Sequence, residues 1–166
     1  MKTKNIVLIG MSGCGKTTIG QELSKEIEYD FYDCDEYIQN ISNKTISQLF
    51  EEGEDVFRNW EAKACIDLSK KQKCIISTGG GVIKKPENIK FLKETGIIFF
   101  INRPVNHIKK DIDIDSRPLL SKDPTIIYQI FIERYPMYTA AADYNIPNAG
   151  DLLSVVSAIK EVISNA

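Results

Sequence analysis

The segment GMSGCGKT (residues 10–17) combines three glycines with a lysine and a hydroxyl side chain in the spacing GxxxxGKT. Glycine lets the backbone turn tightly, so that successive N–H groups point inward at phosphate oxygens. In this pattern the lysine reaches the β- and γ-phosphates and the threonine hydroxyl binds Mg²⁺. We therefore expect a nucleoside triphosphate with Mg²⁺ to bind through Gly13, Cys14, Gly15, Lys16, Thr17 and Thr18.

The residues on either side of this loop support the interpretation. NIVLIG (5–10) is a continuous apolar run typical of a buried strand, and residues 16–28 have a helical pattern. Strand, loop and helix in this order are the context that the motif requires, which argues against a chance glycine-rich turn. The chain lacks the NKxD and DxxG motifs expected of a GTPase, which favours ATP.

Two aspartates follow the next predicted strand, in FYDCDEYI (31–38). Asp33 and Asp35 could face two different partners. The simpler alternative is that one of them caps a helix, since aspartate is common at that position. The motif alone leaves both open.

Two further motifs could bind an acceptor for the phosphate. In FRNWE (57–61) Arg58 and Glu61 are three residues apart, close enough on a helix to interact, and the alternative is a surface ion pair. In STGGGVI (77–83) three glycines follow an apolar run, where a ligand could approach the backbone closely, and the alternative is an ordinary turn. Their occurrence beside a phosphate loop favours a second ligand site.

Taken in order, GxxGxGKT, DxD, FRxxE, GGG and RPLL resemble shikimate kinase over nearly the whole chain. The resemblance implies a P-loop kinase fold, with a five-stranded parallel sheet, a small substrate-binding segment (about 33–61) and a lid (about 109–123). It implies that the γ-phosphate of ATP moves to the 3-hydroxyl of shikimate, in the pathway to chorismate and the aromatic amino acids.

The resemblance also implies roles for individual residues. Asp33 would hold Mg²⁺ through water together with Thr17, and Arg117 would cover the phosphates from the lid. Lys16, Asp35 and Arg117 would be the catalytic residues. The shikimate contacts would be Asp35, Arg58, Gly79, Gly80, Gly81 and Arg134. Arginine suits a carboxylate because its planar fork donates two parallel hydrogen bonds. Aspartate can accept a proton from an attacking hydroxyl.

The chain departs from the family pattern at two places. Lys110 stands where the family has an arginine that stacks on adenine, and the turn between Phe50 and Gly53 is one residue shorter. The alternatives are another kinase of this fold, for gluconate or a nucleoside monophosphate, or a non-catalytic nucleotide-binding module. Arg58, Arg134 and the glycine run favour a small carboxylate over a nucleotide, and the intact motif set argues against a non-catalytic module.

The elements that must position these residues alternate along the chain. NIVLIG, FYD, CIIS (74–77), IIFFI (97–101) and DYNI (143–146) are the expected strands. Helices are expected at 16–28, 54–71 and 86–94, and after Asp151, a candidate N-cap. Such alternation predicts a three-layer α/β/α fold around a parallel sheet, in one domain spanning 1–166, with ligands at the carboxyl ends of the strands.

The composition fits a soluble globular protein. A net charge of −2 gives no basic excess for nucleic acid, and the apolar runs are too short to span a membrane or act as a signal peptide. The four cysteines form no CxxC pair and His107 is the only histidine, so neither a zinc site nor a disulfide scaffold is expected. We expect a cytoplasmic monomer with free thiols, and no role for His107.

Overall fold

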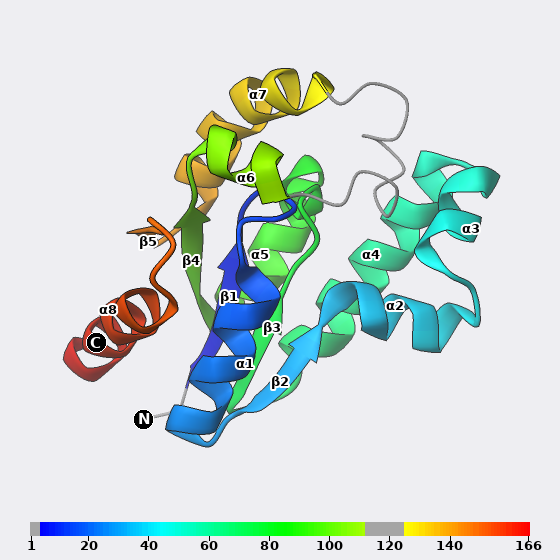
Figure 1. Ribbon diagram of the computed structural model, residues 1–166. Helices are drawn as coiled ribbons and strands as arrows, with labels where there is room; N and C mark the ends of the chain where they lie inside the picture. The colour runs from blue at the N-terminus through cyan, green and yellow to red at the C-terminus, as the bar shows by residue number, and fades with distance from the viewer. Residues whose placement is uncertain (1–3, 112–124) are drawn as a thin grey trace.

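The computed structural model describes residues 4–111 and 125–166, and it is built around one parallel sheet with the strand order β2-β3-β1-β4-β5. In Figure 1 the strands run side by side through the middle of the molecule, and their carboxyl ends meet at one edge. The strands are β1 (Asn5–Ile9), β2 (Asp30–Asp33), β3 (Cys74–Ser77), β4 (Gly96–Asn102) and β5 (Tyr144–Pro147).

Helices cover both faces of this sheet (Figure 1). Helices α1 and α8 pack against each other on one face, whereas α4 and α5 pack together on the other, where α7 contacts β4. The helices are α1 (Lys16–Ile27), α2 (Cys34–Ser42), α3 (Ile46–Glu52), α4 (Glu54–Ser69), α5 (Pro86–Thr95), α6 (Val105–Asp111), α7 (Ile126–Ala141) and α8 (Leu152–Asn165), with a 3₁₀ turn, η1 (Val82–Lys84).

The central strands form the core because they are apolar on both faces. Every residue of β1 and β3 is buried, as expected for parallel strands between two layers of helices. The register pairs Ile6 of β1 with Ile75 of β3 and Ile97 of β4. This places the ends of β1 and β4 next to each other, where the phosphate loop begins.

Helices α2, α3 and α4 form a smaller unit beside the sheet, drawn in cyan and green in Figure 1. They have an apolar cluster of their own, made by Ile38, Leu49, Phe57 and Ala64. A capping box at Thr45 and Gln48 starts α3, and Gly53, with φ 138°, makes the turn into α4. The segment is therefore a packed structure rather than a loop.

The predicted fold class is confirmed, and the five strands lie where the apolar runs predicted them, within a residue or two at each end. The predicted helices also occur, and Asp151 is the N-cap residue of α8, but its carboxylate accepts a hydrogen bond from the Ser154 hydroxyl and caps no backbone N–H. Within the described residues no helix is long and apolar enough to cross a membrane. Of the predicted lid, residues 109–111 end α6, whereas Arg117 lies outside the described residues.

Candidate active site

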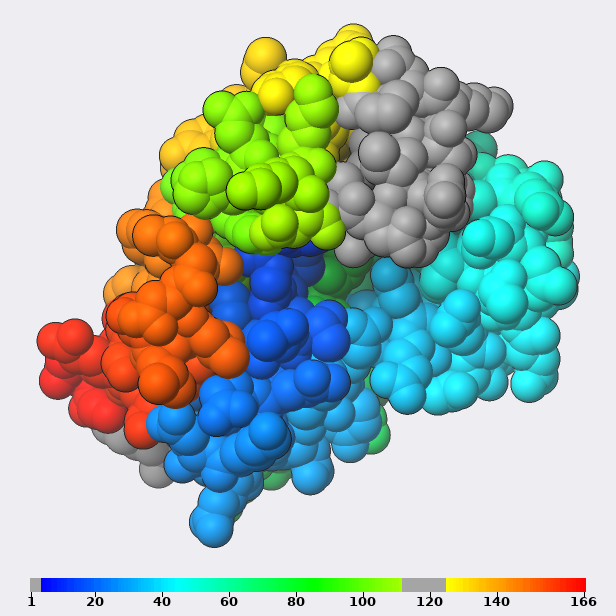
Figure 2. Space-filling model, in the orientation of Figure 1, coloured from blue at the N-terminus to red at the C-terminus, as the bar shows by residue number. Residues whose placement is uncertain are grey.

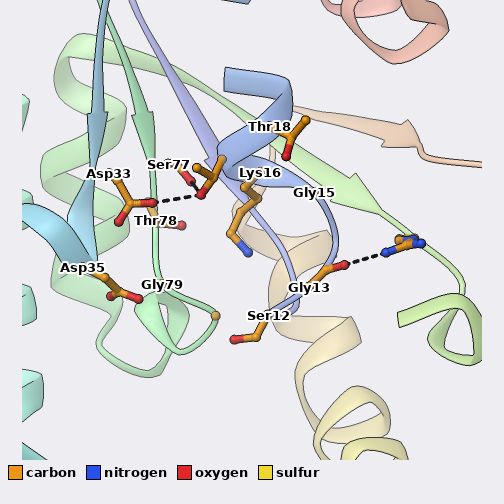
Figure 3. Close-up of a pocket in the computed structure, with 13 residues that line it drawn as sticks. Ser12, Gly13, Gly15, Lys16, Thr18, Asp33, Asp35, Ser77, Thr78 and Gly79 are labelled. Atoms are coloured by element: carbon orange, nitrogen blue, oxygen red, sulfur yellow. Dashed lines mark hydrogen bonds between the residues drawn. The ribbon is translucent and has the colours of Figure 1, made fainter. Parts of the chain in front are cut away.

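A pocket of about 330 Å³ opens at the carboxyl edge of the sheet, between the phosphate loop, the end of β2 and the turn after β3. Figure 3 shows Lys16, Asp33 and Asp35 pointing into it from different elements. Its walls are Ser12, Gly13, Gly15, Lys16, Thr17, Thr18, Asp33, Asp35, Ser77, Thr78, Gly79, Gly80 and Arg103. The predicted residues Cys14, Gly81, Arg58 and Arg134 lie outside this lining.

The phosphate loop has the backbone that its glycines predict. Gly10, Gly13 and Gly15 have φ values of 146°, 84° and 101°, which side chains disfavour. At Gly10 a β-carbon would also lie 2.7 Å from the Ile101 carbonyl oxygen of β4. The loop therefore fits against β4 only with glycine at this position.

Lys16 is buried and folded back over this loop. Its Nζ donates to the carbonyl oxygens of Gly10 at 2.7 Å and Met11 at 2.9 Å. The backbone N–H of Cys14 donates to the same Met11 carbonyl, and the Cys14 thiol is buried. Cys14 thus contributes to the turn, while the Lys16 ammonium is held within the pocket by two carbonyl groups.

Oxygen groups suited to a magnesium ion gather beside Lys16. The Thr17 hydroxyl donates to Asp33 Oδ2 at 2.9 Å, and Ser77 Oγ lies 3.5 Å from Thr17 Oγ1 (Figure 3). Mg²⁺ is usually bound by one or two carboxylates together with waters and phosphate oxygens, and Asp33 offers one such carboxylate here. Asp33 also caps α2, because its Oδ1 accepts the Glu36 backbone N–H at 3.1 Å. The capping interpretation is therefore confirmed. The second oxygen of the same carboxylate lies beside the hydroxyl groups of Thr17 and Ser77.

Asp35 lies on the other side of the pocket, next to the glycine turn. A β-carbon on Gly79 would be 3.3 Å from Asp35 Oδ1 and 2.9 Å from Glu61 Oε2. Asp33 is the N-cap of α2 and Asp35 belongs to its first turn, and the Asp33 carboxylate contacts Thr17 whereas that of Asp35 lies beside Gly79. Asp35 thus lines the same pocket as Thr17 and Asp33, and it approaches Gly79 together with the buried Glu61.

That second group contains a buried ion pair. Arg58 Nη1 lies 2.9 Å from Glu61 Oε1, and Arg58 Nη2 lies 3.2 Å from Glu54 Oε1. The Arg58 and Glu61 side chains are only 8% and 1% exposed, which rules out the surface ion pair considered from the sequence. A β-carbon on Gly81 would lie 2.5 Å from Arg58 Cζ, so glycine is needed for the arginine to occupy this place.

Arg134 brings a second guanidinium to the same turn from α7. It is buried, and a β-carbon on Gly80 would lie 3.4 Å from its Nη1 and 2.9 Å from Ser12 Oγ of the phosphate loop. The neighbouring Tyr138 hydroxyl donates to the Gly80 carbonyl, and burial raises the pKa of Tyr138. Among the described residues no carboxylate forms a salt bridge with Arg134. The glycine turn therefore separates the phosphate loop from two buried arginines.

The comparisons with known proteins agree with this arrangement. A family model for shikimate kinase matches residues 12–164. The chain belongs to the shikimate kinase family. A shikimate kinase from Clostridium beijerinckii is 48% identical over 163 residues, which cover 98% of this chain and 96% of that protein.

Two solved structures extend the similarity to three dimensions. The shikimate kinase of Acinetobacter baumannii, in complex with shikimate, superposes with a TM-score of 0.93 and is 32% identical, covering 98% of this chain and 94% of that one. The shikimate kinase of Aquifex aeolicus gives 0.85 at 35% identity, covering 96% of both chains. The protein is thus a kinase of this family, and ATP is the phosphate donor that the family implies.

The two departures from the shikimate kinase pattern have different outcomes. Phe50 keeps a defined place despite the shorter turn, since its ring stacks on Phe57 at 4.5 Å and lies 5.9 Å from Arg58 Cζ. Lys110, in contrast, is exposed near the end of α6 and does not line the pocket. Asp111, which follows it, pairs with Arg103.

Sequence motifs missed several residues of the pocket. Ser12, Ser77, Thr78 and Arg103 line it without belonging to the expected set. Ser77, Thr78 and Arg103 lie at or just after the ends of β3 and β4, and this position at the carboxyl edge is the signal that could have found them. The four cysteines are free and buried. Burial raises the pKa of Cys74 to about 11, so the Cys74 thiol stays protonated at neutral pH.

Glu61 gives the site a pH-dependent stability. Burial raises the pKa of Glu61 above its usual 4.5, although Arg58 opposes this effect. Because the folded state holds the proton more tightly, the Glu61 contribution to stability is complete below pH 4.5 and declines as the pH rises through the folded-state pKa. In the wild type, the free energy of unfolding should fall by about 1.4 kcal/mol for each unit by which the pKa of Glu61 is raised. Urea unfolding at a series of pH values should show no such fall for a Glu61→Gln variant.

The matched control is Glu87→Gln, which changes an exposed carboxylate at the start of α5. It should follow the wild-type dependence on pH. If Glu61→Gln also runs parallel to the wild type between about pH 4 and pH 8, Glu61 is not the group responsible.

Proposed function

We propose that the protein transfers the γ-phosphate of ATP to the 3-hydroxyl of shikimate, with Mg²⁺. The observation that carries the proposal is the placement of two buried arginines, Arg58 and Arg134, against a glycine turn that borders the phosphate loop. Guanidinium groups recognise carboxylates by paired, charge-assisted hydrogen bonds. Shikimate carries one carboxylate and three hydroxyls, and it is the ligand in the complex of the Acinetobacter baumannii shikimate kinase.

The acceptor side of the pocket would orient shikimate by its two kinds of polar group. Arg58 and Arg134 would bind the carboxylate. The backbone of Gly79, Gly80 and Gly81, which lets Asp35, Arg134 and Arg58 approach closely, would contact the ring. Glu61 holds Arg58 from one side, and Phe57, whose ring lies 5.1 Å from Arg58 Cζ, supports it from another. Asp35 would accept hydrogen bonds from the hydroxyls and take the proton of the attacking one.

The donor side would bind and neutralise the phosphates. When ATP enters, Lys16 would exchange the carbonyls of Gly10 and Met11 for the β- and γ-phosphate oxygens. Thr17 and Asp33 are the residues that would hold Mg²⁺, directly and through water, and the ion would offset the negative charge of the transferred group. Arg117 is expected to act on the same phosphates. Positioning and charge neutralisation are the main contributions that a protein makes to phosphoryl transfer.

We further propose that the protein is a cytoplasmic monomer that acts on small molecules, not on nucleic acid or membranes. Its large exposed apolar side chains in the described part of the chain are Ile132, Tyr144 and Leu153, on separate elements. Scattered apolar residues of this kind are normal on a monomer surface.

A coupled assay of ADP release tests the proposed reaction. With saturating ATP and Mg²⁺, we expect release that depends on shikimate, and only background with gluconate, AMP or no acceptor. Omitting Mg²⁺ should remove the activity. Release driven by gluconate or AMP would show that the arginine pair serves another acceptor, and ATP binding without release for any acceptor would favour a non-catalytic module.

A further inference from the structure

Two carbonyl groups on the outside of the phosphate loop are each held by a side chain from another part of the sheet. In a loop whose N–H groups face inward toward phosphate, the carbonyls face outward and need donors elsewhere. The Cys14 carbonyl accepts from Asn148 Nδ2 at 2.9 Å, and the Gly13 carbonyl accepts from Arg103 Nη1 at 2.8 Å. Neither donor belongs to the motifs that identify the family.

Asn148 is fixed from three sides. It follows β5 directly and is 8% exposed. Its backbone N–H donates to the Asn102 carbonyl at 2.9 Å, which joins it to the end of β4. Its Oδ1 accepts the Gly150 N–H at 3.0 Å, so the amide must direct its NH₂ group at Cys14. A β-carbon on Gly15 would lie 3.1 Å from Nδ2, which shows how closely the amide packs against the loop.

Arg103 holds the loop from the neighbouring strand. It follows β4 directly, and its second fork nitrogen, Nη2, forms an ion pair with Asp111 at the end of α6. Figure 3 shows its bond to Gly13. In Figure 2 the start of α1, in blue, adjoins the light green surface of α6 and the orange surface around and after β5. Both donors therefore reach the loop from the side of β1 on which β4 and β5 lie.

We propose that Asn148 and Arg103 are positioning residues, which hold the phosphate loop in its anion-binding conformation before the nucleotide arrives. This inference rests on the proposed nucleotide site. Without these donors the Gly13 and Cys14 carbonyls would turn toward water. The Cys14 N–H, in the same peptide as the Gly13 carbonyl, would lose its bond to the Met11 carbonyl, which closes the turn. The Gly15 N–H, in the same peptide as the Cys14 carbonyl, would turn away from the phosphates. Apparent affinity then falls with the fraction of molecules that keep the competent loop.

The test is direct titration of MgADP and of magnesium tripolyphosphate, an anion without a nucleoside. Asn148→Ala removes the donor without changing charge and should weaken both ligands by the same factor, about 5- to 30-fold. Shikimate affinity should stay within about twofold. Asn145→Ala is the matched control, because it removes an exposed amide from β5, three residues earlier.

A second variant keeps the proposal testable if Asn148→Ala unfolds. Arg103→Lys retains the positive charge but cannot bind Gly13 and Asp111 with one planar fork, so it should weaken both ligands about 3- to 10-fold. Thermal melting should show both variants folded at the titration temperature.

Three results would overturn the inference. Unchanged affinity for both ligands in both variants would mean that the loop keeps its shape without these donors. Weaker MgADP binding with unchanged tripolyphosphate binding would mean that Asn148 contacts the nucleoside instead. A wild-type protein that binds neither ligand would refute the nucleotide site itself. Because shikimate phosphorylation plays no part in these titrations, a wrong acceptor would not affect them.

Discussion

Replacing Lys16 with alanine should lower kcat about 100- to 1,000-fold, because a charged donor aimed at the transferred phosphate is lost. Lys16 is the lysine that lies inside the phosphate loop, and its ammonium is already held in the pocket by the Gly10 and Met11 carbonyls. Coupled ADP release at saturating shikimate and ATP measures the effect. The KM for shikimate should change little, since Lys16 serves the donor side.

The same substitution has a structural cost that must be measured separately. Alanine leaves two loop carbonyls without their donor, so a modest loss of thermal stability is expected. Lys25→Ala is a suitable control, because Lys25 is on the same helix, α1, with its side chain 73% exposed. A folded Lys16→Ala protein that keeps most of the wild-type kcat would show that the lysine is structural only.

The local features of the sequence predicted the sheet and the phosphate loop well. Strands β1 and β3 are buried at every position. A continuous apolar run in the sequence indicates such a strand, because it is covered by helices on both faces. The loop is equally local, since its glycines and Lys16 lie within seven residues and their roles follow from backbone geometry. Asp33 shows the limit of such reasoning. From the sequence, a helix cap and a ligand-binding residue are alternatives for this aspartate. In the structure one carboxylate oxygen caps the α2 backbone and the other contacts Thr17.

Features that depend on distant partners could not be predicted. Helices α2 and α3 have nine and seven residues, too short to be recognised by periodicity, and they are stable because they pack on α4. Helix α7 contains Pro136, although proline normally ends a helix or bends it.

The burial of Arg58 and the hydrogen bond from Asn148 to the phosphate loop also depend on residues far away in the sequence. Asn148 reaches across 134 residues of sequence to Cys14. No spacing rule connects two residues that are brought together only when β5 joins the sheet. For the same reason the sequence cannot distinguish Arg58 and Glu61 from an ordinary ion pair on a helix surface. Their burial depends on the glycine turn, which packs against Arg58.

Replacing Arg134 should weaken the binding of shikimate much more than the binding of ATP. Its guanidinium comes from α7, lies against Gly80, and has no salt bridge with a carboxylate in the described residues, so an anion bound there would be its ionic partner. Arg134→Ala should weaken shikimate binding about 10- to 100-fold, or about 1.5–3 kcal/mol, the usual worth of a charge-assisted hydrogen bond. ATP affinity should change less than about twofold.

Two further variants decide whether this effect comes from the planar fork or from the charge. Arg134→Lys keeps the charge and should recover only part of the affinity, because an ammonium cannot bind a carboxylate with two parallel hydrogen bonds. Gly80→Ala, in contrast, should weaken both ligands, since its β-carbon would lie 2.9 Å from Ser12 Oγ and 3.1 Å from Ser12 N of the phosphate loop, and 3.4 Å from Arg134 Nη1. Equal losses for shikimate and ATP in Arg134→Ala would mean that Arg134 supports the fold of α7 and leaves the carboxylate to Arg58.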